Sequence, residues 1–178
     1  HAMKMGTTIK SFLPAATTTM AFAAYTVIVY RGKGACFELP QANNSLGLMM
    51  VYGVDDVLLF FKSRTLEQLA CYAEFLRIWD VVFAVLYASM YGSWISGLFT
   101  KKRMLLVAPA ILAAVFDGFE NFLELQMLRS FVADATVSSE LVRLGSFANA
   151  TKWVFSWLVF FMIAVGLWQN IARRIKRL

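Results

Sequence analysis

Residues 116–124 read FDGFENFLE and place four polar side chains inside a long apolar segment. The four are spaced i, i+3, i+4 and i+7, so an α-helix carries all of them on one face. Alanines continue this face toward the N-terminus and let a neighbouring helix approach closely. The pattern predicts a helix whose polar stripe faces other helices rather than lipid. Its polar members are Asp117, Glu120, Asn121 and Glu124, and the alanines are Ala110, Ala113 and Ala114.

The composition of the 178-residue chain is typical of a membrane protein. Hydrophobic residues make up 60% of it and charged residues 16%, and the mean hydropathy is +0.63. A soluble domain of this size could not cover so much apolar surface, whereas a membrane domain exposes it to lipid. The single histidine, His1, stands in an initial HAM triplet that resembles a cloning remnant. We therefore exclude haem proteins, zinc hydrolases and histidine-dependent nucleophilic enzymes, and we expect no cofactor.

Four segments each offer roughly the 20 apolar residues that a helix needs to cross a bilayer. The connection between the second and the third is very short, so these two helices must be antiparallel neighbours. The sequence predicts an all-α, integral membrane four-helix bundle, a single transmembrane domain over residues 1–178. The spans are about 12–30, 77–99, 104–128 and 152–170, and the first outer loop covers residues 31–76.

The net charge of +6 is concentrated in short segments that contain no acidic residue. Such segments mark the cytoplasmic side of membrane proteins. We therefore expect both termini and the turn after the second span to be cytoplasmic, with residues 31–76 and 129–151 outside. Nucleic-acid binding is not expected. The acid-free basic residues are Lys4, Lys10, Lys101, Lys102, Arg103, Arg173, Arg174, Lys176 and Arg177.

The outer loop contains structure of its own. Residues 46–61 are apolar but too interrupted to span, which predicts one or two short helices at the outer interface or capping the bundle. Thr65 and Gln68 have the spacing of a capping box, so a helix is expected to start there and run into the second span. Cys36 and Cys71 either form a disulfide in an oxidising compartment or remain two unpaired cysteines.

Polar residues on three predicted spans point to a common pocket. A rise of roughly 1.5 Å per residue puts them all in the outer half of the bilayer, although the helices alternate in direction. We therefore predict an outward-facing ligand-binding pocket. Its residues are Arg77, Asp80, Tyr87, Asp117, Glu120, Asn121, Glu124, Lys152 and Ser156, with Thr18 and Tyr25 as weaker candidates from the first span.

The pocket would hold four carboxylates against Lys152, with Arg77 at its rim. Uncompensated carboxylates are costly at low dielectric, so the site must take up protons, admit water or bind a cation. We expect Lys152 to neutralise Asp80 or Glu124, and the deep Asp117 to be the group most easily protonated. Alternatively, the shallower charges are boundary residues that extend outward and knit the bundle. Interfacial anchoring is expected for Trp79, Trp153 and Trp168.

These motifs resemble a group of small bacterial four-helix membrane proteins that have no assigned activity. The shared elements are an Asp–aromatic–Tyr helix, a short basic turn, a D-x-x-E-N helix and a last helix that opens with lysine. Here they are Asp80 with Phe83 and Tyr87, then Asp117, Glu120 and Asn121, then Lys152. The resemblance covers roughly residues 45–165. It implies that these residues act together and that the chain lies in a bacterial inner membrane.

Three classes of function remain open. The first is binding or transport of a cation, a proton, or a polar or cationic lipid head group. Oxygen ligands would suit a hard metal ion, although the sequence does not identify one. The second is a membrane-embedded enzyme that uses Asp117 and Glu120 as acid and base on a lipid or lipid-linked substrate. The third is a structural or assembly protein. Membrane lipids are the expected partners, and a channel would require a homo-oligomer.

Overall fold

The structure, a computed structural model, describes residues 2–39, 45–99, 101 and 103–176, with side chains from residue 12 onward except at 174. Several of the predicted cytoplasmic basic residues therefore lie outside the described residues, wholly or in their side chains. Every described element of regular secondary structure is a helix, as predicted. The basic residues in question are Lys102 and Arg177, and the side chains of Lys4, Lys10 and Arg174.

Within the described chain, three helices are long and apolar enough to cross a membrane, and they match the first, third and fourth predicted spans. The second predicted span, residues 77–99, is not one of them. Its helix begins with an aspartate and contains several serines, glycines and tyrosines. The three helices cover Phe12–Gly34, Arg103–Asp134 and Ser139–Arg173.

The first helix is longer than predicted at both ends. It runs without a break through α1 (Ala2–Tyr25), the π-helical η1 (Thr26–Tyr30) and α2 (Arg31–Gly34). Pro14 therefore lies inside the helix rather than at its start. Arg31 remains helical because its backbone N–H donates to the Thr26 carbonyl, the wider spacing of a π-turn.

The second helical rod starts where the sequence predicts. Thr65 and Gln68 form the capping box reciprocally: the Gln68 N–H donates to Thr65 Oγ1 over 3.2 Å, and the Thr65 N–H donates to Gln68 Oε1 over 3.0 Å. From this cap the chain is helical without interruption into the second predicted span. The rod consists of α4 (Leu66–Glu74), the π-helical η3 (Phe75–Trp79) and α5 (Asp80–Leu98).

The last two helices extend well beyond their predicted bounds. They are α6 (Arg103–Asp134) and α7 (Ser139–Ile175), so most of the predicted outer segment 129–151 is helical. Apolar residues in this extension are buried, among them Val142 and Ala148. Their burial against the outer loop explains why the helices continue past the apolar spans.

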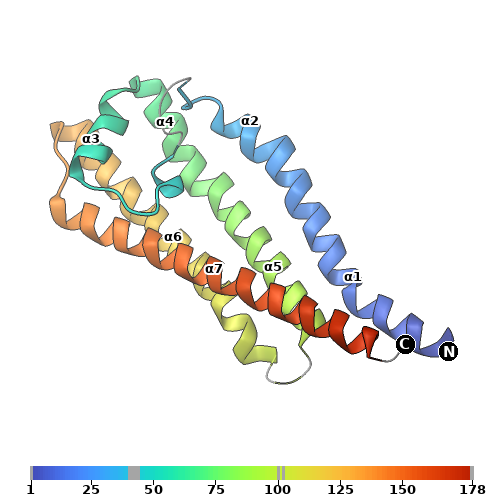
Figure 1. The fold of residues 1–178 in the computed structure, drawn as a ribbon. Coiled ribbons are helices and arrows are strands. Elements are labelled where there is room, and N and C mark those ends of the chain that lie inside the picture. Colours follow the sequence, from blue (N-terminus) through green and yellow to red (C-terminus); the bar gives the residue numbers. More distant parts are fainter. Residues whose placement is uncertain (1, 40–44, 100, 102, 177–178) are drawn as a thin grey trace.

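The helices pack around α5, which contacts α1 on one side and the long α6–α7 pair on the other. Figure 1 shows α1 beginning and α7 ending at the same end of the molecule as the α5–α6 turn. At the opposite end, η2 (Leu46–Leu48), α3 (Val54–Lys62) and α4 form a cap, in agreement with the short helices predicted for the outer loop (Figure 1).

A disulfide and hydrogen bonds join the cap to the first helix. Cys36 and Cys71 form a disulfide, with their Cα atoms 6.4 Å apart, which joins the residues after α2 to α4. Beside it the buried Arg64 guanidinium donates to the Phe37 and Phe60 carbonyls, each over 2.8 Å. Burial lowers the pKa of Arg64 from its usual value. These contacts hold the outer end of the first helix against the cap.

Packing at Gly145 gives a test of how α6, α7 and the cap meet. A Cβ at this buried position would lie 2.5 Å from Tyr52 Oη and 2.6 Å from Met127 Cε. Because the Tyr52 ring is itself buried, Gly145→Ala should destabilise the protein by about 1–3 kcal/mol in thermal unfolding. The matched control is Gly118→Ala, where nothing lies within 4 Å of the added carbon. Equal melting temperatures for the two variants would contradict this packing.

Candidate binding site

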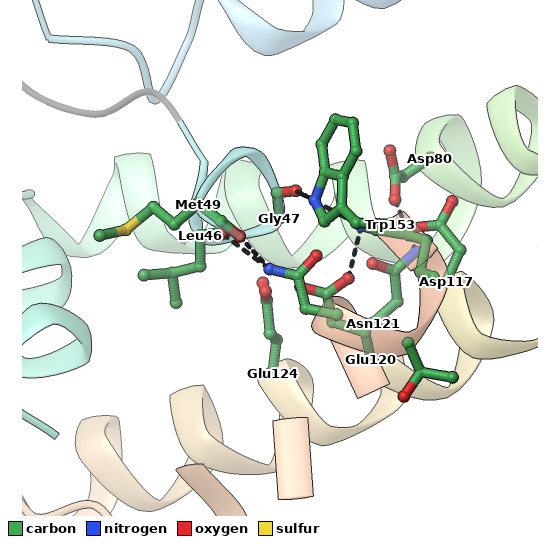
Figure 2. Close-up of polar contacts among 12 residues, drawn as sticks. Leu46, Gly47, Met49, Asp80, Asp117, Glu120, Asn121, Glu124 and Trp153 are labelled. Carbon is green, nitrogen blue, oxygen red and sulfur yellow. Dashed lines mark hydrogen bonds and ion pairs between the residues drawn. The ribbon is translucent and has the colours of Figure 1, made fainter. Parts of the chain in front are cut away.

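The polar faces of α5, α6 and α7 meet in one buried cluster near the cap. Apart from Tyr87, its members are the polar or charged residues that the sequence places on those faces, and each is at most 9% exposed. Figure 2 shows several of them grouped between the helices and beside the Leu46–Met49 segment. The buried members are Asp80, Tyr87, Asp117, Glu120, Asn121, Glu124, Lys152 and Ser156.

The Lys152 ammonium is the positive centre of this cluster. Its Nζ lies 2.9 Å from Asp117 Oδ1 and 2.6 Å from Glu120 Oε2. The predicted pairing with Asp80 or Glu124 is therefore wrong, and Asp117 is not remote from the lysine. The prediction compared Cα heights, whereas four methylene groups carry the ammonium well away from its own Cα. Lys152 is directed into the protein and does not extend outward.

Asp80 has a different environment. The Tyr30 hydroxyl donates to its Oδ1 over 2.8 Å, and Asn121 Nδ2 donates to its Oδ2 over 2.7 Å. Both donors are neutral, and the described residues include no ion-pair partner for Asp80. Its carboxyl group is thus hydrogen-bonded only to neutral side chains.

Two further tyrosines complete the polar contacts. Tyr87 Oη donates to Asp117 Oδ2 over 3.2 Å, and Tyr72 Oη donates to Glu124 Oε2. Burial, followed by the proximity of Glu124, raises the pKa of Tyr72 well above its usual value. Tyr72 therefore stays a protonated donor at neutral pH.

Tyr30 and Tyr72 are functional candidates that the sequence analysis misses. In a regular α-helix, residues i and i+7 share a face, but the π-turn η3 adds a residue between Tyr72 and Asp80. Across this turn, residues eight apart share a face as residues seven apart do in a regular helix. An i, i+8 spacing from Asp80 would therefore have indicated Tyr72. The first span contributes Tyr30, whereas Thr18 donates to the Pro14 carbonyl and Tyr25 to the Trp79 carbonyl.

The same π-turn explains why Arg77 is not at the pocket rim. Arg77 lies within η3 and its side chain is exposed, away from the polar cluster. Its predicted position assumed a regular helix in which residues three apart share a face. Arg77 is therefore not a pocket residue, contrary to the prediction.

A cavity of about 290 Å³ lies against the cluster. One wall is polar, and the others are largely aromatic. Glu120 does not line the cavity, but it pairs with the ammonium of Lys152, which does. The polar wall consists of Asp80, Asp117, Asn121, Glu124, Lys152 and Ser156, and the aromatic residues are Phe22, Tyr30, Phe83, Tyr87, Tyr91, Trp153 and Phe160.

The segment around η2 covers the outer side of the cavity and is held there by α7. Asn149 Nδ2 donates to the Leu46 and Met49 carbonyls, and Trp153 Nε1 donates to the Gly47 carbonyl over 3.3 Å (Figure 2). Trp153 thus lines the site and positions this segment, in addition to any anchoring role. Asn149 is fully buried and is another residue that the sequence analysis misses.

The cavity reaches the surface beside apolar residues. Two of its lining residues are substantially exposed, Leu48 at 64% and Phe160 at 46%. Phe160 belongs to the apolar flank of α7, where the neighbouring Trp157 and Phe161 are also exposed. A molecule in the cavity could therefore keep a polar group at the cluster and an apolar group at this flank.

The described side chains include no group of three or more His, Cys, Asp or Glu residues that could hold a metal ion. The carboxyl groups are instead engaged by the lysine, the tyrosines and the asparagine. The geometry thus gives no support to the divalent-cation form of the binding hypothesis.

No protein family, curated protein or solved structure matches the chain. The resemblance to small bacterial four-helix membrane proteins therefore remains a prediction from short motifs.

The ion pairs of Lys152 can be tested by charge removal. Lys152→Met leaves Asp117 and Glu120 buried without their cation and should destabilise the protein by about 3–5 kcal/mol in denaturant unfolding. Adding Glu120→Gln should recover part of this loss. The control is Arg143→Met, which breaks the exposed pair with Glu140 and should change stability by less than about 1 kcal/mol. Better recovery with Asp80→Asn than with Glu120→Gln would contradict the observed pairing.

Proposed function

We propose that the chain is a four-span membrane protein whose cavity binds the cationic head group of an amphipathic molecule in the outer leaflet. The observation that carries this proposal is Asp80, a buried carboxyl group without a cationic partner among the described residues, in the polar wall of a largely aromatic cavity.

The membrane assignment rests on the three long apolar helices and on their surfaces. Large apolar side chains are exposed along them, such as Ile28 at 74%, Val115 at 58% and Phe161 at 65%. Water would disfavour these surfaces, whereas lipid accommodates them. The helix α5 contacts α1, α6 and α7, so we propose that it crosses the membrane with them.

The orientation follows from the charges at the end opposite the cap. Lys101, Arg103 and Arg173 lie at the helix ends there, which favours a cytoplasmic location for that end and an external location for the cap. A disulfide between the first helix and the cap suits an oxidising, external compartment.

Cysteine labelling of intact cells tests this orientation. Met50 in the cap and Lys101 in the α5–α6 turn are both exposed, and the two native cysteines are bonded to each other. A membrane-impermeant maleimide should label Met50→Cys and spare Lys101→Cys until the cells are opened. Labelling of Lys101→Cys alone in intact cells would reverse the proposed topology.

Charge supports a cationic ligand. Asp80, Asp117, Glu120 and Glu124 are four buried carboxyl groups, and Lys152 is the one ammonium that pairs with any of them in the described chain. A ligand cation beside Asp80 would add positive charge to a cluster in which carboxyl groups outnumber the ammonium. Oxygens Oδ1 and Oδ2 each accept one hydrogen bond, so each retains a lone pair for a ligand.

The aromatic walls suit the same kind of group. The Tyr30 and Phe83 rings have centroids 4.3 Å apart, and Phe83, Tyr87 and Tyr91 continue as a row of ring contacts along α5. Aromatic faces attract amine and quaternary ammonium groups, most strongly where water is excluded. A carboxylate among such rings is therefore better suited to an organic cation than to a strongly hydrated metal ion.

The exposed edge of the cavity favours an amphiphile over a small solute. Leu48 and Phe160 line the cavity and also face outward, so an alkyl chain can pass between them toward the apolar flank of α7. The enzyme alternative is less well supported, because Asp117 and Glu120 both hold the same ammonium rather than acting separately. A purely structural role would not require a cavity at the polar cluster.

Thermal unfolding in nanodiscs tests the proposal. A ligand that binds only the folded state stabilises it by RT ln(1 + [L]/Kd), roughly 2.7 kcal/mol at a hundredfold excess over Kd. Tetradecyltrimethylammonium should raise the melting temperature, whereas a maltoside with the same alkyl chain should not. Asp80→Asn should abolish the rise, because it removes the charge and keeps the shape.

Asp134→Asn provides the matched control, since this aspartate is exposed at the end of α6. It should respond to the cationic amphiphile as the wild type does. An equal response to the cationic and the neutral amphiphile, or an unchanged response in Asp80→Asn, would contradict head-group binding at this site.

A further inference from the structure

We infer that a cationic head group enters this site in exchange for a proton, so that each ligand bound releases about one proton from the buried carboxyl cluster. This inference rests on the proposed function and adds the ionic stoichiometry of the site.

The first step is the charge count. Four carboxyl groups, each at most 8% exposed, face one ammonium in the described cluster. Full ionisation would leave a net charge of −3, the difference between four negative charges and one positive charge. Removing each unbalanced ion from water costs several kcal/mol even after the protein relaxes. The empty cluster is therefore expected to retain protons on its surplus carboxyl groups.

The arrangement of the carboxyl groups agrees with retained protons. Glu120 and Glu124 lie one turn apart on α6, and each is 1% exposed. An ionised carboxylate has no hydrogen to donate, whereas a protonated carboxyl group can donate a hydrogen bond to its neighbour. No N–H or hydroxyl donor in the described part of the chain reaches the buried Glu120 Oε1. The Glu124 carboxyl is thus the group that can supply the missing hydrogen bond.

The second step identifies the proton that the ligand replaces. Asp117 and Glu120 contact the lysine ammonium directly, so this cation is already paired with them. Glu124 also lines the cavity, and it accepts a hydrogen bond from the Tyr72 hydroxyl. Asp80 lines the cavity beside the Tyr30 and Phe83 rings, which suit an organic cation, and has no cation of its own among the described residues. It is therefore the carboxyl group whose proton a bound cation would replace.

The groups around Asp80 permit both protonation states. The titratable or charged groups near it are Tyr25 and Tyr30 from the first helix, Tyr87 from α5, Asp117 from α6 and Lys152 from α7. Among them only Lys152 is cationic, and its ammonium is engaged elsewhere. The Tyr30 hydroxyl can donate to an ionised Asp80 or rotate to accept from a protonated one. The hydrogen bond between Tyr30 and Asp80 can thus form in both protonation states of Asp80.

The exchange is balanced in atoms and charge. Empty Asp80 carries its carboxyl proton; when the ligand cation arrives, the O–H bond breaks, the carboxylate pairs with the cation and the proton leaves to water. The charge of the cluster is the same before and after. Affinity should therefore rise with pH, by about tenfold per unit while Asp80 is protonated in the empty site, and level off above that range.

Calorimetric titration of the full chain in nanodiscs tests the exchange. Tetradecyltrimethylammonium is the probe, because its permanent charge contributes no proton of its own. Titrations in buffers of different ionisation enthalpy give the number of protons released, which should be close to one per ligand. The dissociation constant should fall about tenfold per pH unit in the same range. Asp134→Asn should behave as the wild type.

Tyr30→Phe keeps the Asp80 charge but removes the hydroxyl that serves both protonation states. It should shift the pH range of proton release, which a merely structural role for Tyr30 would leave in place. Saturable binding with no proton release and a pH-independent dissociation constant would overturn the exchange while leaving the proposed function intact. Absence of binding at every pH would overturn both.

Discussion

The ammonium of Lys152 holds α6 and α7 in the relation that makes the site. It links α7 to Asp117 and Glu120 on α6, over 2.9 and 2.6 Å. It also reaches the Gly47 carbonyl of the cap at 3.4 Å, so the cap, α6 and α7 converge on one buried charge. With the ammonium committed in this way, Asp80 on α5 faces the cavity without a cation from the described chain. The proposed specificity for a cationic ligand thus follows from the pairing of Lys152 with Asp117 and Glu120.

The cap and the aromatic side chains enclose a cavity beside these charged groups. Asn149 and Trp153 fix the η2 segment through backbone carbonyls, which leaves little freedom at the outer side of the site. Phe160, which lines the cavity and is exposed, lies instead on the apolar flank of α7. Polar recognition and apolar access are therefore separated in space, as an amphipathic ligand requires.

Helical spacing alone predicts the all-helical fold and the polar faces of α5, α6 and α7. It also predicts the Thr65–Gln68 capping box. Spacing does not predict which charges pair, because a long lysine side chain reaches past the carboxyl groups level with its Cα. Nor does it reveal the contributions of Tyr72 or the exclusion of Arg77, since a regular helix was assumed across the π-turn η3. Asn149 and the η2 segment meet only through the tertiary fold, between residues about a hundred positions apart.

The two π-turns restrict the single-residue deletions that this chain can accept in evolution. Tyr30 is the last residue of η1, and Asp80 follows directly after η3, so an extra residue precedes each partner of their hydrogen bond. Deleting one residue from either turn would restore a regular α-helix and keep the apolar composition. The deletion would also rotate the Tyr30–Asp80 pair out of contact. Loss of a single codon at either turn would thus leave a continuous helix but remove the contact between Tyr30 and Asp80.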